Sequence, residues 1–276
     1  MLNVQNLLTG ESSLVKQFVF NDGSVQVEIT DPVIDQDTGP VLIEAILQTP
    51  ADQMALVMLV NAIRHMSPMS EINLYLPFCP YSRQDYVFLP GQPNAMQAWA
   101  GLINSLNFRT VNIVDPHSIA SEMINNCIVT SALEALQNFG TFIDPVSMTL
   151  VSPDAGANKK CHKIAQTFGF SKLIRADKAR DLATGNIIET EIYGDVDGET
   201  CLIIDDICDG GMTFIKLAEA LKERGAKSVI LYVTHGLFTK GLRVFEGLID
   251  EVYTTNTWIR PDGVADGYSG KFEVIC

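Results

Sequence analysis

The sequence predicts an α/β protein in which helices pack on mainly parallel sheets. Short apolar or β-branched runs alternate along the chain with amphipathic stretches, which is the pattern of repeated strand–helix–strand units. Both halves of the chain also contain a strand that ends in an aspartate and continues into a loop. With 276 residues, of which 47% are hydrophobic, the chain can bury the core of one large domain or two medium domains.

Five runs are predicted as strands because they are short, rich in apolar or β-branched residues and bounded by turn residues. In chain order they are Ile72–Pro77, Val111–Asp115, Thr149–Ser152, Cys201–Ile204 and Val229–Thr234. Ligands of open α/β sheets bind at the carboxyl ends of the strands. The loops in NIVDPHS, LVSPDAG and LIIDDICDGG are therefore candidate sites.

Two amphipathic helices are predicted between these strands, because apolar residues recur at helical spacing on one face. The first covers Ala51–Met66, and the second ends at Gly225, a favourable C-terminal stop. Their apolar stripes are Leu56, Leu59, Val60 and Ile63 in the first helix, and Phe214, Leu217, Ala218 and Leu221 in the second. Gly and Pro interrupt the pattern in Asn138–Pro145, so we place a domain boundary near residue 143, between residues 1–143 and 144–276.

The charge and the cysteines exclude several classes of protein. The chain has 19 basic and 33 acidic residues and a net charge of -14, which repels nucleic acid and anionic membranes, so we expect neither as a partner. The six cysteines are scattered without a Cys-x-x-Cys pair, which fits a reducing compartment. No segment reaches the apolar length that crosses a bilayer. We therefore expect a cytoplasmic protein.

The most informative segment is CLIIDDICDGGMTF, residues 201–214. Asp205 and Asp206 close a predicted strand, Asp209 follows, and the turn Gly210–Thr213 opens the next helix. Paired carboxylates can hold the hydroxyls of a ribose or the water of a metal ion, and a glycine turn can aim backbone N–H groups at a phosphate. The structural alternative is that Asp209 only caps the helix. We favour a site for a sugar phosphate, because two adjacent buried carboxylates without a partner would be costly.

Together with the segment AEALKERGAKSVILYVTHGLF that follows it, this loop resembles the phosphoribosyl-diphosphate-binding loop of the phosphoribosyltransferase fold. The resemblance to one family with that loop, the ribose-phosphate diphosphokinases, covers most of the chain. It extends through four earlier segments in the same order, FNDGSVQVEI (Phe20–Ile29), LPFCPYSRQD (Leu76–Asp85), VDPHS (Val114–Ser118) and VSPDAG (Val151–Gly156). The resemblance therefore implies two phosphoribosyltransferase-like domains, with an active site at their strand ends.

The resemblance also implies a reaction, in which diphosphate passes from Mg-ATP to the C1 hydroxyl of ribose 5-phosphate and yields 5-phosphoribosyl 1-diphosphate and AMP. It implies ATP and a ribose phosphate as substrates, Mg²⁺ as cofactor, and a homo-oligomer, either a dimer or a hexamer. The resemblance implies ATP contacts for Arg83, Gln84 and Asp85, and for Phe20 and Asp22 from a neighbouring subunit. It implies Mg²⁺ ligation for His117 and Asp154, and closure over the transferring phosphates by a mobile loop that carries Lys178 and Arg180. It implies ribose-phosphate binding for Asp205, Asp206, Asp209, Gly210, Gly211, Met212 and Thr213.

Some of these roles also have a direct physical interpretation. A neutral imidazole at a strand end, as in His117, can bind metal, but Mg²⁺ prefers oxygen ligands, so phosphate oxygens and water would complete the shell beside Asp154. Lys178 and Arg180 share one face if the chain is extended, and two cations suit a transition state that spreads charge over phosphate oxygens. An ordinary solvated loop at Lys178 remains the alternative.

The residues around Arg83 leave two alternatives open. A surface ion pair with Asp85 would explain Arg83 without function, whereas Tyr81 and Tyr86 beside an arginine could stack on a base. We assign His162 and His235 to structure, because neither lies in a second motif that it could complete.

The chain departs from the family at positions that bear on the substrate. The family's phosphate turn usually runs Asp-Thr-Gly-Gly-Thr, but Gly210 stands here in place of the first threonine and Met212 in place of a glycine. The segment Tyr86–Met96 has no basic residue where the family is rich in Arg and Lys, and Ser24 replaces a usual glutamate. ADP-ribose as acceptor is therefore an alternative to ribose 5-phosphate, which the family favours. A phosphoribosyltransferase and a catalytically silent regulatory homologue are further alternatives.

Overall fold

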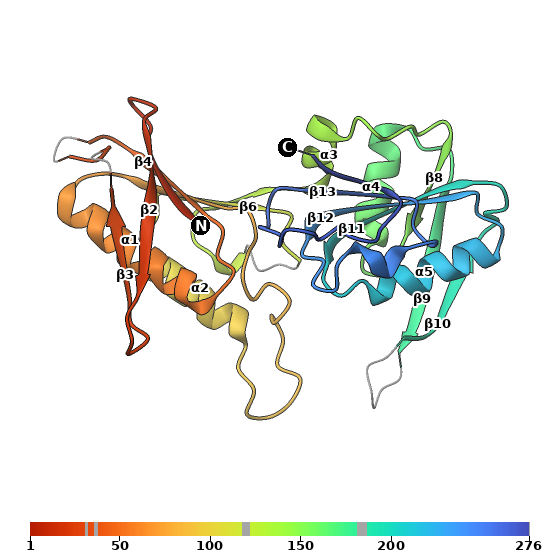
Figure 1. Cartoon of the computed structure of the whole chain (residues 1–276), viewed down its shortest axis with the longest axis horizontal. Helices are drawn as coiled ribbons and strands as arrows, with labels where there is room; N and C mark the ends of the chain where they lie inside the picture. The colour runs from red at the N-terminus through yellow and green to blue at the C-terminus, as the bar shows by residue number, and fades with distance from the viewer. Residues whose placement is uncertain (31–32, 36–37, 118–121, 181–186, 276) are drawn as a thin grey trace. The chain divides into compact units, whose positions relative to one another are not determined.

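The computed structural model describes residues 1–30, 33–35, 38–117, 122–180 and 187–275. The chain forms two compact units, Met1–Ser131 and Ala132–Cys276 (Figure 1). Each unit contains one seven-stranded sheet, and the predicted α/β class is confirmed. The predicted boundary near residue 143 lies inside the second unit, because Leu133 and Leu136, which precede it, pack into the core of that unit.

The first sheet combines a parallel part with an antiparallel edge. Its strands are β1 (Leu2–Asn6), β2 (Ser12–Val19), β3 (Val25–Ile29), β4 (Val41–Ala45), β5 (Ile72–Leu76), β6 (Thr110–Val114) and β7 (Cys127–Thr130). Their order is β3-β2-β1-β4-β5-β6-β7. β4 to β7 are parallel, so their carboxyl ends meet at one edge, while β1, β2 and β3 pair antiparallel.

Two helices, α1 (Pro50–Met66) and α2 (Ala95–Ser105), pack against this sheet and share its apolar core (Figure 1). The predicted stripe of α1 is buried in full, as the periodicity indicated. Its start is fixed by a capping box, in which the Thr49 hydroxyl accepts the Asp52 N–H at 3.1 Å and the Asp52 carboxylate accepts the Thr49 N–H at 2.8 Å.

The second sheet is parallel except at one edge strand. Its strands are β8 (Met148–Ser152), β9 (Leu173–Arg180), β10 (Ile187–Tyr193), β11 (Thr200–Cys208), β12 (Ser228–Gly236), β13 (Glu251–Thr255) and β14 (Lys271–Ile275). Their order is β10-β9-β8-β11-β12-β13-β14, and only β10 runs antiparallel to its neighbour. The carboxyl ends of β8, β11 and β12 therefore lie side by side.

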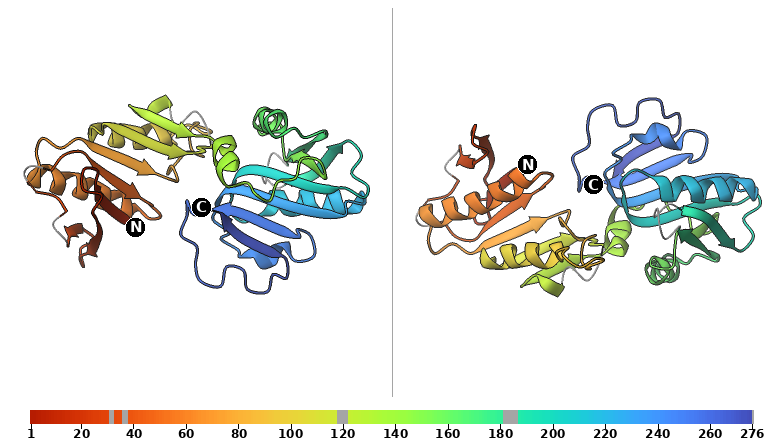
Figure 2. Two further views of the ribbon diagram at one scale, coloured as in Figure 1. Left: turned by 90° about the horizontal axis from the view of Figure 1, so that it is seen from above. Right: turned by 90° about the horizontal axis from the view of Figure 1, so that it is seen from below.

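Helices cover both faces of this second sheet (Figure 2). They are α3 (Ala132–Phe139), α4 (Asn158–Phe168), α5 (Met212–Glu223) and the 3-10 helix η2 (Leu242–Phe245). The residues of β11 alternate between two cores, since Leu202 and Ile204 pack with α3 and α4 while Cys201 and Ile203 pack with α5 and η2. Burial on both faces explains the unbroken apolar run at the start of this strand.

The predicted end of one strand was wrong. The sequence predicted a strand over Cys201–Ile204 with the acidic pair closing it, but β11 continues to Cys208. The ladder to β12 carries it further, with Asp205 opposite Val233 and Ile207 opposite His235. Asp205 and Asp206 are thus strand residues, held by pairing to a buried neighbour that overrides the low strand propensity of aspartate.

Candidate active site

The turn between β11 and α5 is shaped by one glycine. Gly211 has φ of +80° and ψ of -2°, a left-handed conformation that disfavours any other residue. A Cβ atom on Gly211 would lie 2.8 Å from two ring carbons of Phe245, so the turn rests on the core. The helix begins at Met212, and no side chain caps its start. No side chain therefore takes up the first N–H groups of α5, which is the condition under which a helix start can bind an anion.

The acidic pair lies in a partly buried environment. Asp206 is 5% exposed, and the Asp206 N–H donates to a carboxylate oxygen of Asp205 at 2.9 Å. Burial, followed by the nearby charge of Asp206, raises the pKa of Asp205 well above its usual value. A hydroxyl donor or a cation placed beside this buried carboxyl group would lower its raised pKa, because either one stabilises the charged form.

Asp209 is held from a different part of the chain. The Thr239 hydroxyl donates to its carboxylate at 2.7 Å, and the Thr239 N–H donates to its carbonyl at 3.1 Å. Thr239 lies just beyond the carboxyl end of β12, the strand next to β11. Lys240 follows, and its alkyl chain passes over Gly210, with Cε 3.5 Å from where a Cβ would stand. Thr239 and Lys240 lie outside the residues predicted from the sequence, because no local pattern shows that β12 becomes the neighbour of β11.

Asp154 lies at the same edge of the second sheet. It follows β8, which pairs in parallel with β11, and its carboxylate accepts the Ala157 N–H at 3.0 Å. Burial raises the pKa of the Cys161 thiol on α4 to about 12, and the charges of Asp205 and Asp154 add to that rise. Asp154 therefore follows the strand next to β11, at the edge of the sheet that also carries the acidic loop.

The predicted ATP residues of the first unit lie on its own carboxyl edge and on a hairpin. Arg83 and Gln84 are exposed in the loop that follows β5, and the Gln84 carbonyl accepts the Met96 N–H at 3.1 Å. The neighbouring Asp85 carbonyl accepts the Asn94 side chain at 2.8 Å. These two bonds tie the middle of the loop to the start of α2.

The two tyrosines that flank this loop differ. Tyr81 donates to Gln53 at 3.1 Å and packs its ring 5.9 Å from that of Trp99, so it belongs to the core. Tyr86 is 68% exposed and contacts the ring of Phe88 edge on, with the ring centroids 5.4 Å apart. Of the two, only Tyr86 presents its ring to solvent, where a base could stack.

Phe20 and Asp22 lie in the turn between β2 and β3. Phe20 is 56% exposed, while the Asp22 carboxylate accepts both the N–H and the hydroxyl of Ser24, at 2.9 Å and 2.7 Å. These bonds hold the pKa of Asp22 below its usual value. Ser24, which replaces the glutamate usual in the family, thus stabilises the turn between β2 and β3 through its bonds to Asp22.

Three further predicted positions differ in what the structure describes. His117 is exposed just beyond the end of β6, in the first unit. Lys178 and Arg180 belong to the extended end of β9, and their side chains lie outside the described part of the chain. His235 is buried and its Nδ1 lies 2.9 Å from the Thr257 hydroxyl, which supports its assignment to structure.

The donor set at the second sheet fits Mg²⁺ in kind. Carboxylate oxygens at Asp154, Asp205 and Asp209 are the ligand type that this ion prefers, and it commonly takes only one or two of them beside water and phosphate. No group of three or more His, Cys, Asp or Glu side chains in the described ranges is arranged as a complete metal site.

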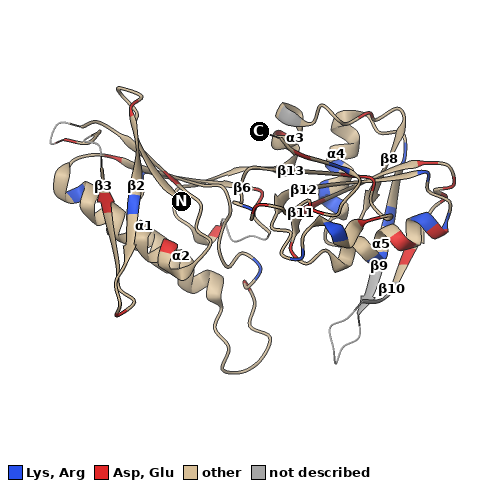
Figure 3. Ribbon diagram, in the orientation of Figure 1, with Lys and Arg blue, Asp and Glu red and all other residues tan. Residues whose placement is uncertain are grey.

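Acidic and basic residues occur in both units (Figure 3). No described helix is long and apolar enough to span a membrane.

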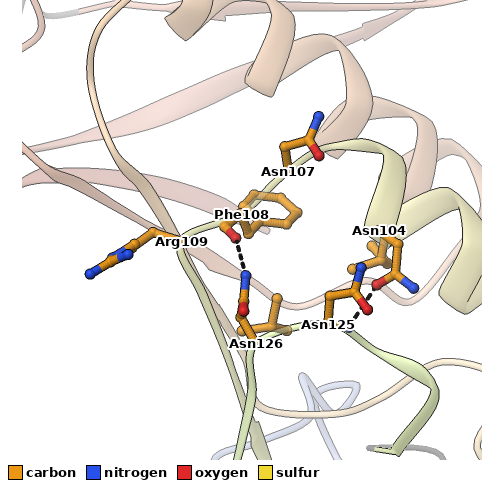
Figure 4. A pocket seen from close by; sticks show the side chains of 8 residues that line it. Asn104, Asn107, Phe108, Arg109, Asn125 and Asn126 are labelled. Carbon is orange, nitrogen blue, oxygen red and sulfur yellow. Dashed lines mark hydrogen bonds between the residues drawn. The ribbon is translucent and has the colours of Figure 1, made fainter.

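A separate cavity of about 290 Å³ lies at the opposite edge of the first sheet, where β6 and β7 begin (Figure 4). Two of its asparagine side chains form hydrogen bonds with nearby backbone groups. The Asn126 side chain donates to the Phe108 carbonyl at 3.1 Å, and the Asn104 side chain accepts the Asn125 N–H at 2.8 Å. None of the residues predicted for the reaction lines this cavity.

Two mainly parallel sheets flanked by helices, with a glycine turn and acidic residues after a central strand of the second, are the architecture of two phosphoribosyltransferase-like domains. Residues 182–266 match the phosphoribosyl synthetase-associated domain. The chain is 31% identical to the ribose-phosphate pyrophosphokinase of Mycoplasmopsis pulmonis over 249 residues, which cover 88% of this chain and 76% of that protein. It is 30% identical to the enzyme of the same name from Vibrio cholerae over 247 residues, covering 86% and 76% of the two chains.

A solved structure agrees with these matches. The crystal structure of phosphoribosylpyrophosphate synthetase from Mycobacterium smegmatis is similar over 97% of this chain and 87% of its own, with a TM-score of 0.79 and 25% identity. The chain therefore belongs to the ribose-phosphate pyrophosphokinase family, and the family recognised in the sequence is confirmed.

Proposed function

We propose that this protein transfers diphosphate from Mg-ATP to the C1 hydroxyl of ribose 5-phosphate and releases AMP. The observation that carries the proposal is the match to named ribose-phosphate pyrophosphokinases over most of the chain. The geometry of the second sheet supports it, because α5 starts without a capping side chain directly after β11, the strand that carries Asp205 and Asp206 and ends just before Asp209. That combination suits a ligand with a phosphate at one end and hydroxyls at the other.

Each residue has a role in this proposal. Asp205, Asp206 and Asp209 accept the ribose hydroxyls and so orient the C1 hydroxyl, while the N–H groups of the Gly210–Thr213 turn take the 5-phosphate. Lys178 and Arg180 balance the charge of the diphosphate as it moves. Phe20, Asp22, Arg83, Gln84 and Asp85 bind ATP, and His117 and Asp154 hold Mg²⁺. When bound, Mg²⁺ supplies charge neutralisation at the phosphate oxygens.

The raised pKa of Asp205 fits this proposal. In the absence of a ligand, burial beside Asp206 disfavours its charged form. A ribose hydroxyl that donates to this carboxylate, or a cation nearby, relieves that cost. The binding of substrate and of Mg²⁺ are therefore expected to favour each other.

The alternatives have weaker support. The relatives are named for ribose phosphate, and they give no support to ADP-ribose as acceptor. A phosphoribosyltransferase would consume the diphosphate sugar and would not form AMP from ATP. A silent homologue would bind nucleotide without turnover, although this chain retains Lys178, Arg180, His117 and Asp154.

One experiment separates these possibilities. The purified protein is supplied with ATP and Mg²⁺ and with either ribose 5-phosphate or ADP-ribose, and AMP release and product mass are followed. We expect AMP and a 1-diphosphate product with ribose 5-phosphate. Turnover with ADP-ribose and not with ribose 5-phosphate would overturn the proposal that ribose 5-phosphate is the acceptor. The absence of turnover with both would overturn the proposal that the protein is an active enzyme. Sedimentation in the same buffer tests the prediction of a dimer or hexamer.

A further inference from the structure

The backbone conformation at position 210 does not require a glycine. Its φ lies outside the left-handed region, unlike that of Gly211, so other residues fit its conformation. The atoms that a Cβ at Gly210 would meet all belong to the Lys240 side chain, at ordinary contact distances from 3.5 to 4.0 Å. The missing side chain at position 210 is therefore matched by a lysine that occupies the space beside it.

Lys240 is positioned by its neighbour. Thr239 donates both its hydroxyl and its N–H to Asp209, so the backbone at Lys240 is tied to the same turn. Its side chain is exposed, and within the described ranges it forms no salt bridge. By contrast, Lys216 on the next turn of α5 pairs with Glu219 at 2.7 Å.

These observations rest on the proposed function and extend it. We propose that Lys240 binds the 5-phosphate of the sugar, in place of the hydroxyl that a threonine at position 210 would supply. The start of α5 offers N–H groups without a capping side chain, and the lysine adds a mobile positive charge beside them. A charge-assisted contact is stronger than one from a neutral hydroxyl, so the loss of the threonine is compensated.

The alternative role for Lys240 is purely structural, to offset the carboxylates of the acidic loop. The two roles predict different results. A phosphate ligand changes the affinity for the sugar phosphate and not for ATP. A lysine that only balances charge changes the stability of the protein and leaves the affinity for the sugar phosphate unchanged.

The test uses Lys240→Met, which keeps an alkyl chain over Gly210 and removes the charge, with Lys216→Met as the matched control on α5. Binding of ribose 5-phosphate is measured by calorimetry in the presence of Mg²⁺ and without ATP, and the KM for ATP is measured separately. We expect Lys240→Met to raise the Kd for ribose 5-phosphate about tenfold or more, from the strength of a charged hydrogen bond. The KM for ATP should change less than about twofold, and the control should match the wild type.

A second variant tests the replacement directly. Gly210→Thr in the Lys240→Met background should recover part of the lost affinity, because the hydroxyl returns to the turn. A Kd for ribose 5-phosphate within twofold of the wild type in Lys240→Met would overturn the proposal, as would an equal effect in the control. Failure of the proposed function is distinct, since it appears as binding of ribose 5-phosphate by the wild type without AMP release.

Discussion

Replacing Gly211 by alanine is expected to destabilise the second unit, because two costs add at this position. The left-handed conformation costs a residue with a Cβ about 1–2 kcal/mol. The new Cβ would stand 2.8 Å from two carbons of the Phe245 ring, and such overpacking costs about 1–3 kcal/mol. The free energy of unfolding should therefore fall by about 2–5 kcal/mol, a large part of the roughly 5–15 kcal/mol of a typical domain.

The adjacent glycine provides the control. Gly210→Ala meets only the flexible Lys240 side chain, so it should be neutral or stabilise by up to about 1 kcal/mol through the unfolded chain. Urea unfolding, followed by far-UV circular dichroism and tryptophan fluorescence, measures both variants, since Trp258 lies in the second unit. A loss below about 1 kcal/mol in Gly211→Ala, or an equal loss in Gly210→Ala, would refute the account of the turn.

Three further predictions concern the reaction and its pH dependence. Lys178→Ala should lower kcat by about 100-fold or more and leave the KM for ribose 5-phosphate within about threefold, as initial rates will show; unchanged turnover would remove its role. Asp154→Asn should raise the Mg²⁺ concentration for half-maximal activity about tenfold, and an unchanged Mg²⁺ titration would count against this ligand. Asp205 has a raised pKa when folded, so its stability contribution is present below the unfolded pKa and is lost as pH rises through the folded pKa. Asp205→Asn should therefore be more stable than the wild type at pH 7, with the difference shrinking as the pH falls toward 4, and should bind the sugar phosphate weakly. Equal stability of the two proteins in urea at pH 7 would contradict the burial of this charge.

The fold was accessible from the sequence wherever burial leaves a periodic pattern. The α1 stripe from Leu56 to Ile63 and the α5 stripe from Phe214 to Leu221 are buried as predicted. Such patterns are local, since the helix itself places residues three and four apart on one face. Gly225 also has the positive φ expected of a residue that ends a helix.

The strand edges and the contacts of the loop were not accessible in the same way. Polar residues such as Lys16 and Gln17 lie within β2, where the antiparallel partner and not an apolar pattern keeps the chain extended. β11 likewise passes through Asp205 because β12 continues beside it. Thr239 reaches Asp209 from a segment 30 positions away. Interactions of this kind depend on which strands become neighbours, and no local pattern encodes that.

In the turn between β11 and α5, the fold constrains Gly211 more than it constrains Gly210 and Met212 on either side. Gly211 contacts Phe245 and so is constrained by the core, while Gly210 lies beneath a flexible lysine and Met212 is 50% exposed. Substitutions on either side of the central glycine can therefore accumulate without disturbing the sheet. Exchanges at these two flanking positions are therefore expected to act on ligand contacts, whereas an exchange at Gly211 is expected to act on the stability of the second unit.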